Sequence, residues 1–503
     1  MNKLAIITLE SSSIKLMITK INDDGYFKII DEIITPFSTL DIFLHSKKLS
    51  QEILCEIKET LINYKTLCEK LEAKKIITCA TYIYSKIIEK DNLSKLFKNI
   101  LNTKLEYLSW KNEAYYDYLN LSNSIYYESA LVVDVAGYST NISIVKDKNI
   151  LKNVHIPIGS INISYTYDLI DRASKENVTS TLDYIKKELI KLKSFKSIKY
   201  DSVYFIGDTI QCLNRIDRYR KNIPLTIAHN YTTTDLDIID IFNLVKGKNH
   251  LQRTRLEGMS SHLASTITGG AAIVHGIISY FNICKLTISS RNLNDSIMFE
   301  YIDKNYIHKD DILDYCLYGL INELNINKTH AEHIYSLSLQ LFNDLKELHN
   351  LDDSYKKIIK TAALLHDAGI NINYYNHHKH SFYLILNSYI DGLTHKELFL
   401  SASIAACHRN RNNYNFSFGE YSFFANKWDL KVINKISILL RIAESLDISM
   451  TQSVKNLSIA IDKCTVTLNI KTDKNILLEQ IEVQKCTRKF KEIYDRNLII
   501  NII

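Results

Sequence analysis

The chain has little proline and glycine, with 3 and 13 of these residues in 503. Linkers rich in them are therefore few, and domain boundaries must be found from changes of pattern. The 9 cysteines are scattered, odd in number and without a C-x-x-C pair. This argues against a disulfide framework or a cysteine-bound zinc and fits a reducing cytoplasm. No run of about eighteen uncharged apolar residues occurs, so we expect no membrane span.

Charge of either sign is also limited. The formal net charge is +6, and 23% of the residues are charged against 46% hydrophobic. A globular protein with large cores is expected from this balance. The net charge is too mild to indicate nucleic-acid binding, and we expect no nucleic-acid partner. The apolar start of the chain is too short for a signal peptide and favours a strand, so the expected location is cytoplasmic.

The chain is organised around residues 130–145, which read ALVVDVAGYSTNISIV. Two apolar runs flank a small, polar turn, which predicts a β-hairpin whose turn at Gly137 can hold a phosphate. Asp134 ends the first run, where a carboxylate can hold a metal ion or orient water. Residues 4–18, LAIITLESSSIKLMI, repeat the pattern, with Ser11 at the place of Gly137 and Ser13 at the place of Ser139. The alternative is two unrelated hairpins.

Two copies of strand, phosphate turn and strand suggest duplicated α/β lobes with a cleft between them. This arrangement resembles the actin, Hsp70 and sugar-kinase class of fold, with RNase H-like lobes. Strands are expected at 75–80, 105–109, 201–206 and 285–289, and helices at 49–71, 92–101, 111–121, 178–192, 266–280 and 293–300. Gly207 and Thr209 follow one of these strands at a helix start, a turn that offers N–H groups to an anion.

Helical periodicity replaces the strand signals at about residue 310. Helices are expected at 311–318, 328–348, 353–366, 380–388, 395–407 and 431–445. The tail, at 458–469 and 480–483, alternates apolar and polar residues and predicts a small β-rich cap. We therefore expect a first lobe at 1–125, a second at 126–308, a helical domain at 309–456 and a small α+β cap at 457–503.

Histidines and carboxylates concentrate in the helical part. His330 opens one helix, His366-Asp367 ends another and Asp447 follows a third, with His380 and His408 between. Imidazoles and carboxylates together suit divalent metals. The order resembles the H…HD…D pattern of the HD superfamily of metal-dependent phosphohydrolases. By that resemblance, His330, His366, Asp367 and Asp447 would hold a metal ion. The alternative is a helical domain whose histidines and acids bond one another without metal.

The whole chain resembles the exopolyphosphatase / guanosine pentaphosphate phosphohydrolase (Ppx/GppA) family. The stretches that carry this resemblance, in family order, are LESSSIK at 9–15, Ala80-Thr81, NEA at 112–114, DVAGYST at 134–140, PIG at 157–159, GDT at 207–209, GGA at 269–271, residues 293–296, and then LLHDAGI, NHHKHSFYLILNS, ACHR and LLRIAESLD.

The resemblance implies release of terminal phosphate from inorganic polyphosphate, or of the 5′ γ-phosphate from pppGpp, by a homodimer that uses Mg²⁺. Glu113 would activate the attacking water, and Asp134 would be the carboxylate linked to Mg²⁺. A second divalent metal in the HD-type domain is compatible with the pattern. The implied phosphate-binding residues are Ser11, Ser13, Thr81, Gly137, Ser139, Gly207 and Thr209. Without the family order, Glu113 would be an ordinary acid in a helix's first turn and Asp134 a turn-forming acid.

The loops depart from the family pattern at several places. Glu10 stands where the family has glycine and is expected to repel an anion, Ser85 replaces an arginine, and Tyr138 adds bulk to the phosphate turn. Asn141 replaces a second carboxylate, and Asp208 enters a glycine-rich loop. By contrast, the HD stretch follows its pattern closely.

Three interpretations follow. The first is an exopolyphosphatase with a divergent cleft. The second is an enzyme that hydrolyses at the HD-type site and only binds in the lobes. The third is a non-catalytic regulator that binds polyphosphate or guanosine polyphosphates. Substitution of Glu113 would abolish activity only in the first, and substitution of His366 or Asp367 only in the second.

Overall fold

The computed structural model describes residues 2–37, 48–88, 90–306, 311–409, 421, 423–472 and 474–502. The chain forms two compact units, Met1–Asn222 with Ala228–Asp310, and Ile223–Ile227 with Asp311–Ile503. The expected boundary between residues 308 and 309 lies outside the described residues. Each unit is described by itself below.

The first lobe of the first unit is built on a five-stranded sheet of order β3-β2-β1-β4-β5. Its strands are β1 (Asn2–Leu9), β2 (Ser13–Ile21), β3 (Phe27–Pro36), β4 (Lys75–Ala80) and β5 (Glu106–Tyr107). Its helices are α1 (Gln51–Lys70), η2 (Tyr82–Lys86), α2 (Lys90–Leu101) and α3 (Trp110–Ser122). The strand expected at 105–109 is shorter than predicted, and the strand expected at 75–80 has the predicted bounds.

The second lobe repeats this topology. Its sheet has the order β10-β11-β9-β6-β7-β8, so that β8-β7-β6-β9-β11 matches β3-β2-β1-β4-β5. In both lobes the central strand, β1 or β6, pairs antiparallel with the strand that follows it and parallel with its second partner, β4 or β9. The two hairpins expected from the sequence are thus copies of one motif. The strands are β6 (Ser129–Val135), β7 (Thr140–Lys146), β8 (Asn149–Ile156), β9 (Ser202–Ile206), β10 (Tyr231–Thr234) and β11 (Lys285–Ile288).

Helices surround the second sheet and return to the first. They are α4 (Ser160–Thr166), α5 (Lys175–Ile190), α6 (Lys193–Lys196), α7 (Asp208–Arg220), α8 (Asp235–Lys246), α9 (His250–Thr254), η3 (Ser261–Leu263), α10 (Ile267–Phe281) and α11 (Leu293–Asn305). The apolar helix α10 is buried over most of its length against α4, α5 and α8.

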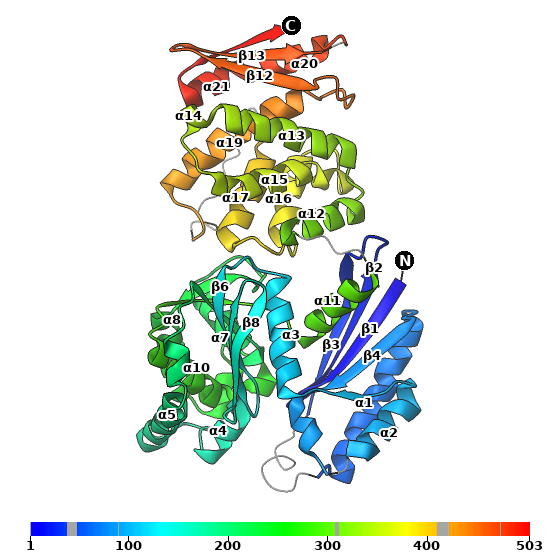
Figure 1. The fold of residues 1–503 in the computed structure, drawn as a ribbon, viewed down its shortest axis with the longest axis vertical. Coiled ribbons are helices and arrows are strands. Elements are labelled where there is room, and N and C mark those ends of the chain that lie inside the picture. The colour runs from blue at the N-terminus through cyan, green and yellow to red at the C-terminus, as the bar shows by residue number, and fades with distance from the viewer. Residues whose placement is uncertain are drawn as a thin grey trace. The chain divides into compact units, whose positions relative to one another are not determined.

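Two helices cross between the lobes. Helix α11 follows the second sheet in sequence but packs on the first lobe (Figure 1). There the Phe299 ring meets Phe27 edge-on at a centroid distance of 5.6 Å, and the Thr19 hydroxyl lies 3.5 Å from Met298 Sδ. Helix α3 contacts β7 and β8 of the second lobe, and Tyr118 Oη donates a hydrogen bond to Lys148 O at 2.6 Å. Since α1 and α2 cover the other face of the first sheet, both faces of its central strands β1 and β2 are buried.

The second unit is helical up to residue 455. Its helices are α12 (Ile312–Glu323), α13 (Lys328–Asp344), α14 (Lys346–His349), η4 (Asp353–Tyr355), α15 (Lys356–Leu365), η5 (Ala368–Asn371), α16 (His377–Asn387), α17 (His395–Ala406) and α19 (Lys427–Ser445). Within the described part of 311–455 there is no strand, as the periodicity predicted.

The cap is an α+β layer. A three-stranded sheet of order β12-β13-β14 joins β12 (Asn456–Ile461), β13 (Thr465–Lys471) and β14 (Asn497–Ile502), and α20 (Leu477–Gln484) and α21 (Thr487–Tyr494) separate β13 from β14. The strand-like alternation at Gln480–Val483 is therefore wrong as a strand prediction. Glu479 and Val483 are the buried residues of α20, and their spacing of four residues fits one helical face.

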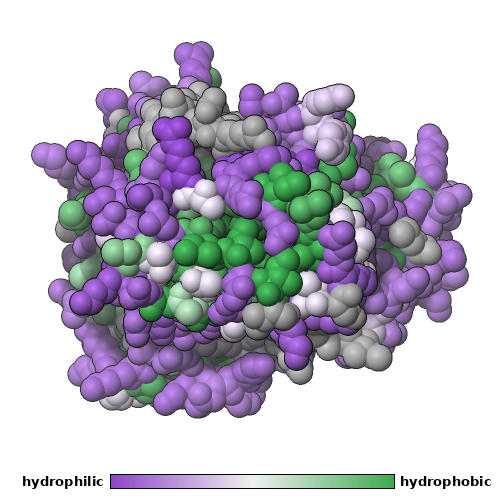
Figure 2. Space-filling view, turned by 90° about the horizontal axis from the view of Figure 1, so that it is seen from above, coloured by the Kyte–Doolittle hydropathy of each residue, from purple (hydrophilic) through white to green (hydrophobic). Residues whose placement is uncertain are grey.

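The face seen in Figure 2 is mostly hydrophilic, with a hydrophobic area near its middle. In the cap, Leu477, Leu478 and Ile481 of α20 are 60%, 51% and 44% exposed. None of the helices in the described residues is both long and apolar enough to cross a membrane.

We predict that Phe299→Ala destabilises the first unit by about 3–5 kcal/mol, because it removes a buried ring from the contact between α11 and the first sheet. Denaturant unfolding followed by circular dichroism measures the loss. The control is Leu151→Ala on β8, a side chain that is 55% exposed, which should change stability by less than about 0.5 kcal/mol. Equal effects of the two substitutions would contradict the packing role of α11.

Candidate functional site

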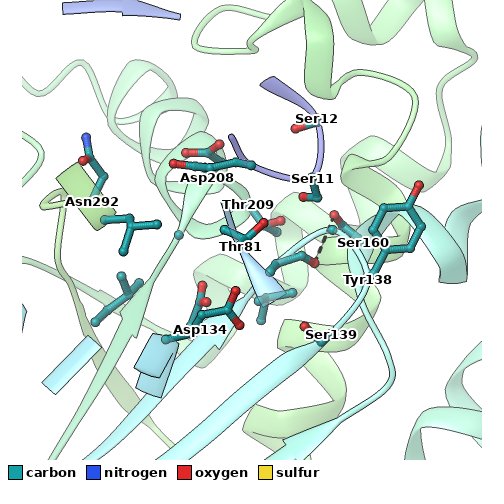
Figure 3. A pocket seen from close by; sticks show the side chains of 18 of the residues that line it. Ser11, Ser12, Thr81, Asp134, Tyr138, Ser139, Ser160, Asp208, Thr209 and Asn292 are labelled. Carbon is teal, nitrogen blue, oxygen red and sulfur yellow. Dashed lines mark hydrogen bonds between the residues drawn. The ribbon is translucent and has the colours of Figure 1, made fainter. Parts of the chain in front are cut away.

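A cleft with a volume of about 120 Å³ opens between the two lobes of the first unit. Figure 3 shows its residues from both lobes, with Ser11, Ser12 and Thr81 of the first lobe near Asp134, Asp208 and Thr209 of the second. The segments that meet here are the β1–β2 and β6–β7 turns and the starts of η2, α3, α7 and α11. Equivalent turns of the duplicated lobes thus face a single cavity.

Glycine is required at two of these turns. Gly207 has φ +97°, and a Cβ there would lie 2.5 Å from Asp134 Oδ1. A Cβ at Gly137 would collide with the Ser11 side chain across the cleft. The backbone therefore lies close to the Asp134 carboxylate at Gly207 and close to the Ser11 side chain at Gly137, and a larger residue would clash at either position.

Glu113 is positioned by the start of α3. Ser109 caps this helix, and its hydroxyl accepts from Asn112 N–H at 3.1 Å, which places Glu113 in the first turn. The Tyr82 N–H donates to Glu113 Oε1 at 2.7 Å. Burial raises the pKa of Glu113 to about 7, although the bonds from Tyr82 and Asn141 oppose the rise. A carboxyl with this pKa can take up a proton near neutral pH.

Asn141, which replaces an expected carboxylate, supports Glu113. Its side chain is 3% exposed and makes a hydrogen bond to the Glu113 carboxylate. Its Oδ1 lies 2.9 Å from His155 Nδ1. Since the amide nitrogen donates to Glu113, we assign the other bond as His155 Nδ1–H donating to Asn141 Oδ1. Asn141 is thus a positioning residue that the departure from the family pattern concealed.

Asp134 and Asp117 add further carboxylates to the cleft. Asp134 lies at the end of β6, opposite Asn141 in the β6–β7 register. Burial and then the charge of Glu113 raise its pKa to about 8. Asp117 follows Glu113 by one turn of α3, and burial and the charge of Asp134 raise its pKa well above the usual range. These groups repel one another, so a divalent cation at Asp134 would relieve the repulsion.

Lys15 lies between the two carboxylates expected to repel an anion. Its side chain is 3% exposed, and Nζ lies 2.9 Å from Glu10 Oε2 and 2.9 Å from Asp208 Oδ1. Burial disfavours the ammonium, but Asp208 and Glu10 raise its pKa above the usual value. The repulsion expected from Glu10 and Asp208 is therefore largely offset. Lys15 is in the stretch LESSSIK, but the sequence does not reveal its ion pair with Asp208, because the two residues are distant in sequence.

The other residues predicted for phosphate binding divide into two groups. Ser11, Thr81, Gly137, Ser139, Gly207 and Thr209 line the cleft. Ser13 does not line it: the residue belongs to β2 and is fully buried. Tyr138 does line the cleft and is 8% exposed. Sequence reasoning also missed Ser160 and Asn292, which line the cavity but carried no motif signal.

The second unit gathers the predicted histidines in its interior. His330 Nε2 and His366 Nε2 lie 3.2 and 3.1 Å from Glu444 Oε2. These donor atoms could hold a metal ion. Burial disfavours the charged ring of His330, but its bonds to Asp447 and Glu444 outweigh this and raise its pKa to about 9. A proton shared with Glu444 therefore competes with a metal ion.

Asp447, predicted as a ligand, lies behind His330. Its Oδ2 is 2.8 Å from His330 Nδ1, and its Oδ1 accepts from Gln452 N–H at 2.7 Å. This is the position of a carboxylate that orients a ligating histidine. Glu444, three residues earlier on α19, lies in the group of donor atoms with His330 and His366. Both acids are in the stretch LLRIAESLD, but the sequence alone does not show which of them lies beside His330 Nε2 and His366 Nε2.

Asp367 belongs to a second group, with His377 and His408. His377 Nε2 lies 3.3 Å from Asp367 Oδ1 and 3.1 Å from His408 Nε2. His380, singled out with His408 from the sequence, is not part of either group. Three histidines occur in the run His377-His378-Lys379-His380. Of these, His377 at the start of α16 is the one that belongs to a donor group.

The duplicated sheets around one cleft define a two-lobe protein of the actin-like class. The chain belongs to the Ppx/GppA phosphatase family, whose model matches residues 18–305. A second model, Ppx/GppA phosphatase, domain III, matches residues 314–485.

Relatives carry names that fit this family. The chain is 23% identical over 433 residues, 84% of each chain, to guanosine-5′-triphosphate,3′-diphosphate pyrophosphatase of Pseudoalteromonas translucida. It is 24% identical over 302 residues to the protein of the same name from Aeromonas hydrophila, and this match spans 59% of each chain.

Solved structures show the same fold. The Ppx/GppA family member of Aquifex aeolicus is 23% identical, with a TM-score of 0.53, and the match covers 61% of this chain and 99% of that one. An exopolyphosphatase from Cytophaga hutchinsonii is 14% identical, with a TM-score of 0.57, and the match covers 60% and 98%.

We predict that Lys15→Met destabilises the first unit by roughly 3 kcal/mol, because it leaves Glu10 and Asp208 facing each other without a counter-charge. The unpaired carboxylates favour protonation, so their folded pKa values rise above the unfolded ones. The loss should therefore be smaller at pH 4.5 than at pH 8. Denaturant unfolding at both pH values measures it, with Lys20→Met at an exposed position of β2 as the control. A loss independent of pH would contradict the ion-pair role.

Proposed function

We propose that the chain hydrolyses a terminal phosphoanhydride, of inorganic polyphosphate or of the 5′ γ-phosphate of pppGpp, in the cleft of the first unit. The observation that carries this proposal is the environment of Glu113. It faces the cleft, is held by Tyr82 N–H and Asn141, and has a pKa raised by burial to about 7. Phosphoryl transfer needs a positioned water and stabilised charge more than covalent chemistry.

Each cleft residue has a proposed role. Glu113 orients the attacking water and accepts its proton. Ser11, Thr81, Ser139 and Thr209, with backbone N–H groups at Gly137 and Gly207, hold phosphate oxygens. Asp134, with Asp117 near it, offers the carboxylate oxygens that Mg²⁺ prefers, and Mg²⁺ supplies charge neutralisation at the transferred phosphoryl group. Ser13 has no role in this proposal because its side chain does not line the cleft.

The relatives' names support a guanosine polyphosphate as substrate. The charge of the cleft limits how a polyanion can bind. Lys15 is already paired with Glu10 and Asp208, so a phosphate chain must bring cations with it or compete for Lys15. We therefore propose that the substrate binds as its magnesium complex. The homodimer and the cytoplasmic location remain predictions, and sedimentation of the purified protein tests the former.

We predict that Glu113→Gln lowers kcat for phosphate release by about 10²–10⁴-fold, because the amide cannot accept the proton of water. In the parent protein the rate should fall as pH falls through about 7, since the base is then protonated. Phosphate release from polyphosphate and pppGpp with Mg²⁺ measures both effects. Glu56→Gln, on an exposed face of α1, is the matched control and should leave the rate unchanged. A Glu113→Gln rate equal to that of the control would refute the cleft mechanism.

A second candidate places hydrolysis in the helical unit, as in an HD-type phosphohydrolase. The observation that favours it is the gathering of His330, His366 and Glu444 around one point. His366 and Asp367 are nearly or fully buried, and Asp447 orients His330. Imidazole and carboxylate donors of this kind fit a divalent transition metal.

The two candidates separate in one assay. We predict that Asp367→Asn leaves kcat for phosphate release within about twofold of the parent, because the proposed chemistry occurs in the cleft. Loss of activity in Asp367→Asn with normal activity in Glu113→Gln would transfer the reaction to the helical unit. A parent that binds polyphosphate or pppGpp but releases no phosphate would support a non-catalytic regulator instead.

A further inference from the structure

In four histidines of the second unit, Nδ1 of the ring is hydrogen-bonded to an oxygen atom. His366 Nδ1 lies 2.7 Å from Ala363 O, and His377 Nδ1 lies 2.8 Å from Tyr374 O. His408 Nδ1 bonds Ala405 O, and His330 Nδ1 bonds the Asp447 carboxylate. A carbonyl or carboxylate oxygen can only accept, so each Nδ1 carries the hydrogen. Wherever such a ring is neutral, its Nε2 carries a lone pair and no hydrogen.

The lone pairs of His377 and His408 point at each other. Their Nε2 atoms are 3.1 Å apart, and neither neutral ring has a hydrogen there to donate. Two acceptors at this distance repel each other unless a positive charge lies close to both. The contact is therefore hard to explain as an ordinary hydrogen bond between neutral rings.

Asp367 supplies the third donor beside this pair. Its Oδ1 is 3.3 Å from His377 Nε2 and 3.8 Å from His408 Nε2. Asp367 is 6% exposed, and within the described residues no hydrogen-bond donor reaches Oδ1. A buried carboxylate oxygen without such a donor is costly, and a cation would satisfy it.

The other oxygen of Asp367 faces the first group. Asp367 Oδ2 lies 3.5 Å from His366 Nε2 and 4.0 Å from His330 Nε2. One carboxylate thus has one oxygen in each of the two donor groups. This is the geometry of a bridging ligand.

We infer that the second unit binds two divalent cations, joined by Asp367. His330, His366 and Glu444 hold one ion, and His377 and His408 hold the other with Asp367. The inference does not depend on where hydrolysis occurs. It goes beyond a single HD-type ion by assigning His377, His408 and Glu444 as ligands and Asp447 as the carboxylate that orients His330. The mixture of imidazoles and carboxylates suits Mn²⁺, Fe²⁺, Co²⁺ or Zn²⁺ better than Mg²⁺.

The proposed centre connects most of the helical unit. Its ligands come from α13, the α15–η5 junction, α16, the end of α17 and α19. Arg409 covers one side, with Nη2 3.1 Å from Glu444 Oε1. Ions held in this way bind the folded state and not the unfolded one, so they stabilise the unit by mass action.

The test uses full-length protein stripped with EDTA, incubated with Mn²⁺ and desalted. Metal analysis gives the ions per chain, and electron paramagnetic resonance distinguishes a magnetically coupled Mn²⁺ pair from isolated ions. We expect a coupled signal in the parent, and a higher melting temperature with Mn²⁺ than with EDTA. In His408→Gln we expect one Mn²⁺ fewer per chain and no coupled signal.

His380→Ala is the matched control, because His380 is on α16 beside His377 but in neither donor group. It should retain the parent's Mn²⁺ content and coupled signal. Ions bound in the cleft of the first unit contribute equally to all three proteins and cancel in the comparison. Equal Mn²⁺ content in His408→Gln and His380→Ala would overturn the inference. So would an uncoupled spectrum of the Mn²⁺-loaded parent, a result that needs no variant to fold.

Discussion

The ion pairs of Lys15 set the electrostatic balance on which the cleft depends. The cavity wall carries the carboxylates Glu10, Glu113, Asp117, Asp134 and Asp208, and Lys15 contacts Glu10 and Asp208. Because Glu10 and Lys15 belong to the first lobe and Asp208 begins α7 of the second, this contact also links β2 of the first lobe to the start of α7 in the second. The remaining acids, Glu113, Asp117 and Asp134, have raised pKa values. They form the part of the cleft where a proton or a cation is most favoured.

The buried carboxylates of the two candidate sites are compensated in different ways. In the cleft, five acids and Lys15 line the same cavity, and the excess negative charge favours a bound cation. In the helical unit, the acids face imidazoles whose Nδ1 atoms donate hydrogen bonds to oxygen acceptors. The first arrangement suits a ligand that enters and leaves. The second suits ions that stay, since its donors are buried and fixed by neighbouring groups.

The sequence predicted the local features well and the distant pairings poorly. Both hairpins, the strand at 75–80 and most of the long helices were predicted, because strand alternation and helical spacing are local signals. Helices α8, α20 and α21 were not predicted. Lys15 was quoted but its role was missed, since Asp208 meets it only when the two lobes assemble. Whether His377 or His380, and Glu444 or Asp447, lies in a group of donor atoms depends on which side of the helix packs inward. In each pair the residues are three apart, so spacing alone could not decide.

The packing of α11 has a consequence for the order in which the chain folds. The strands of the first lobe are synthesised first, yet one face of their sheet is covered by residues Leu293–Asn305. Until those residues have left the ribosome, that apolar face has no cover, whereas the second sheet is already complete at β11. The first lobe is therefore completed after the sheet of the second lobe, although its strands are synthesised earlier. Its exposed apolar face is where a chaperone would bind the nascent chain.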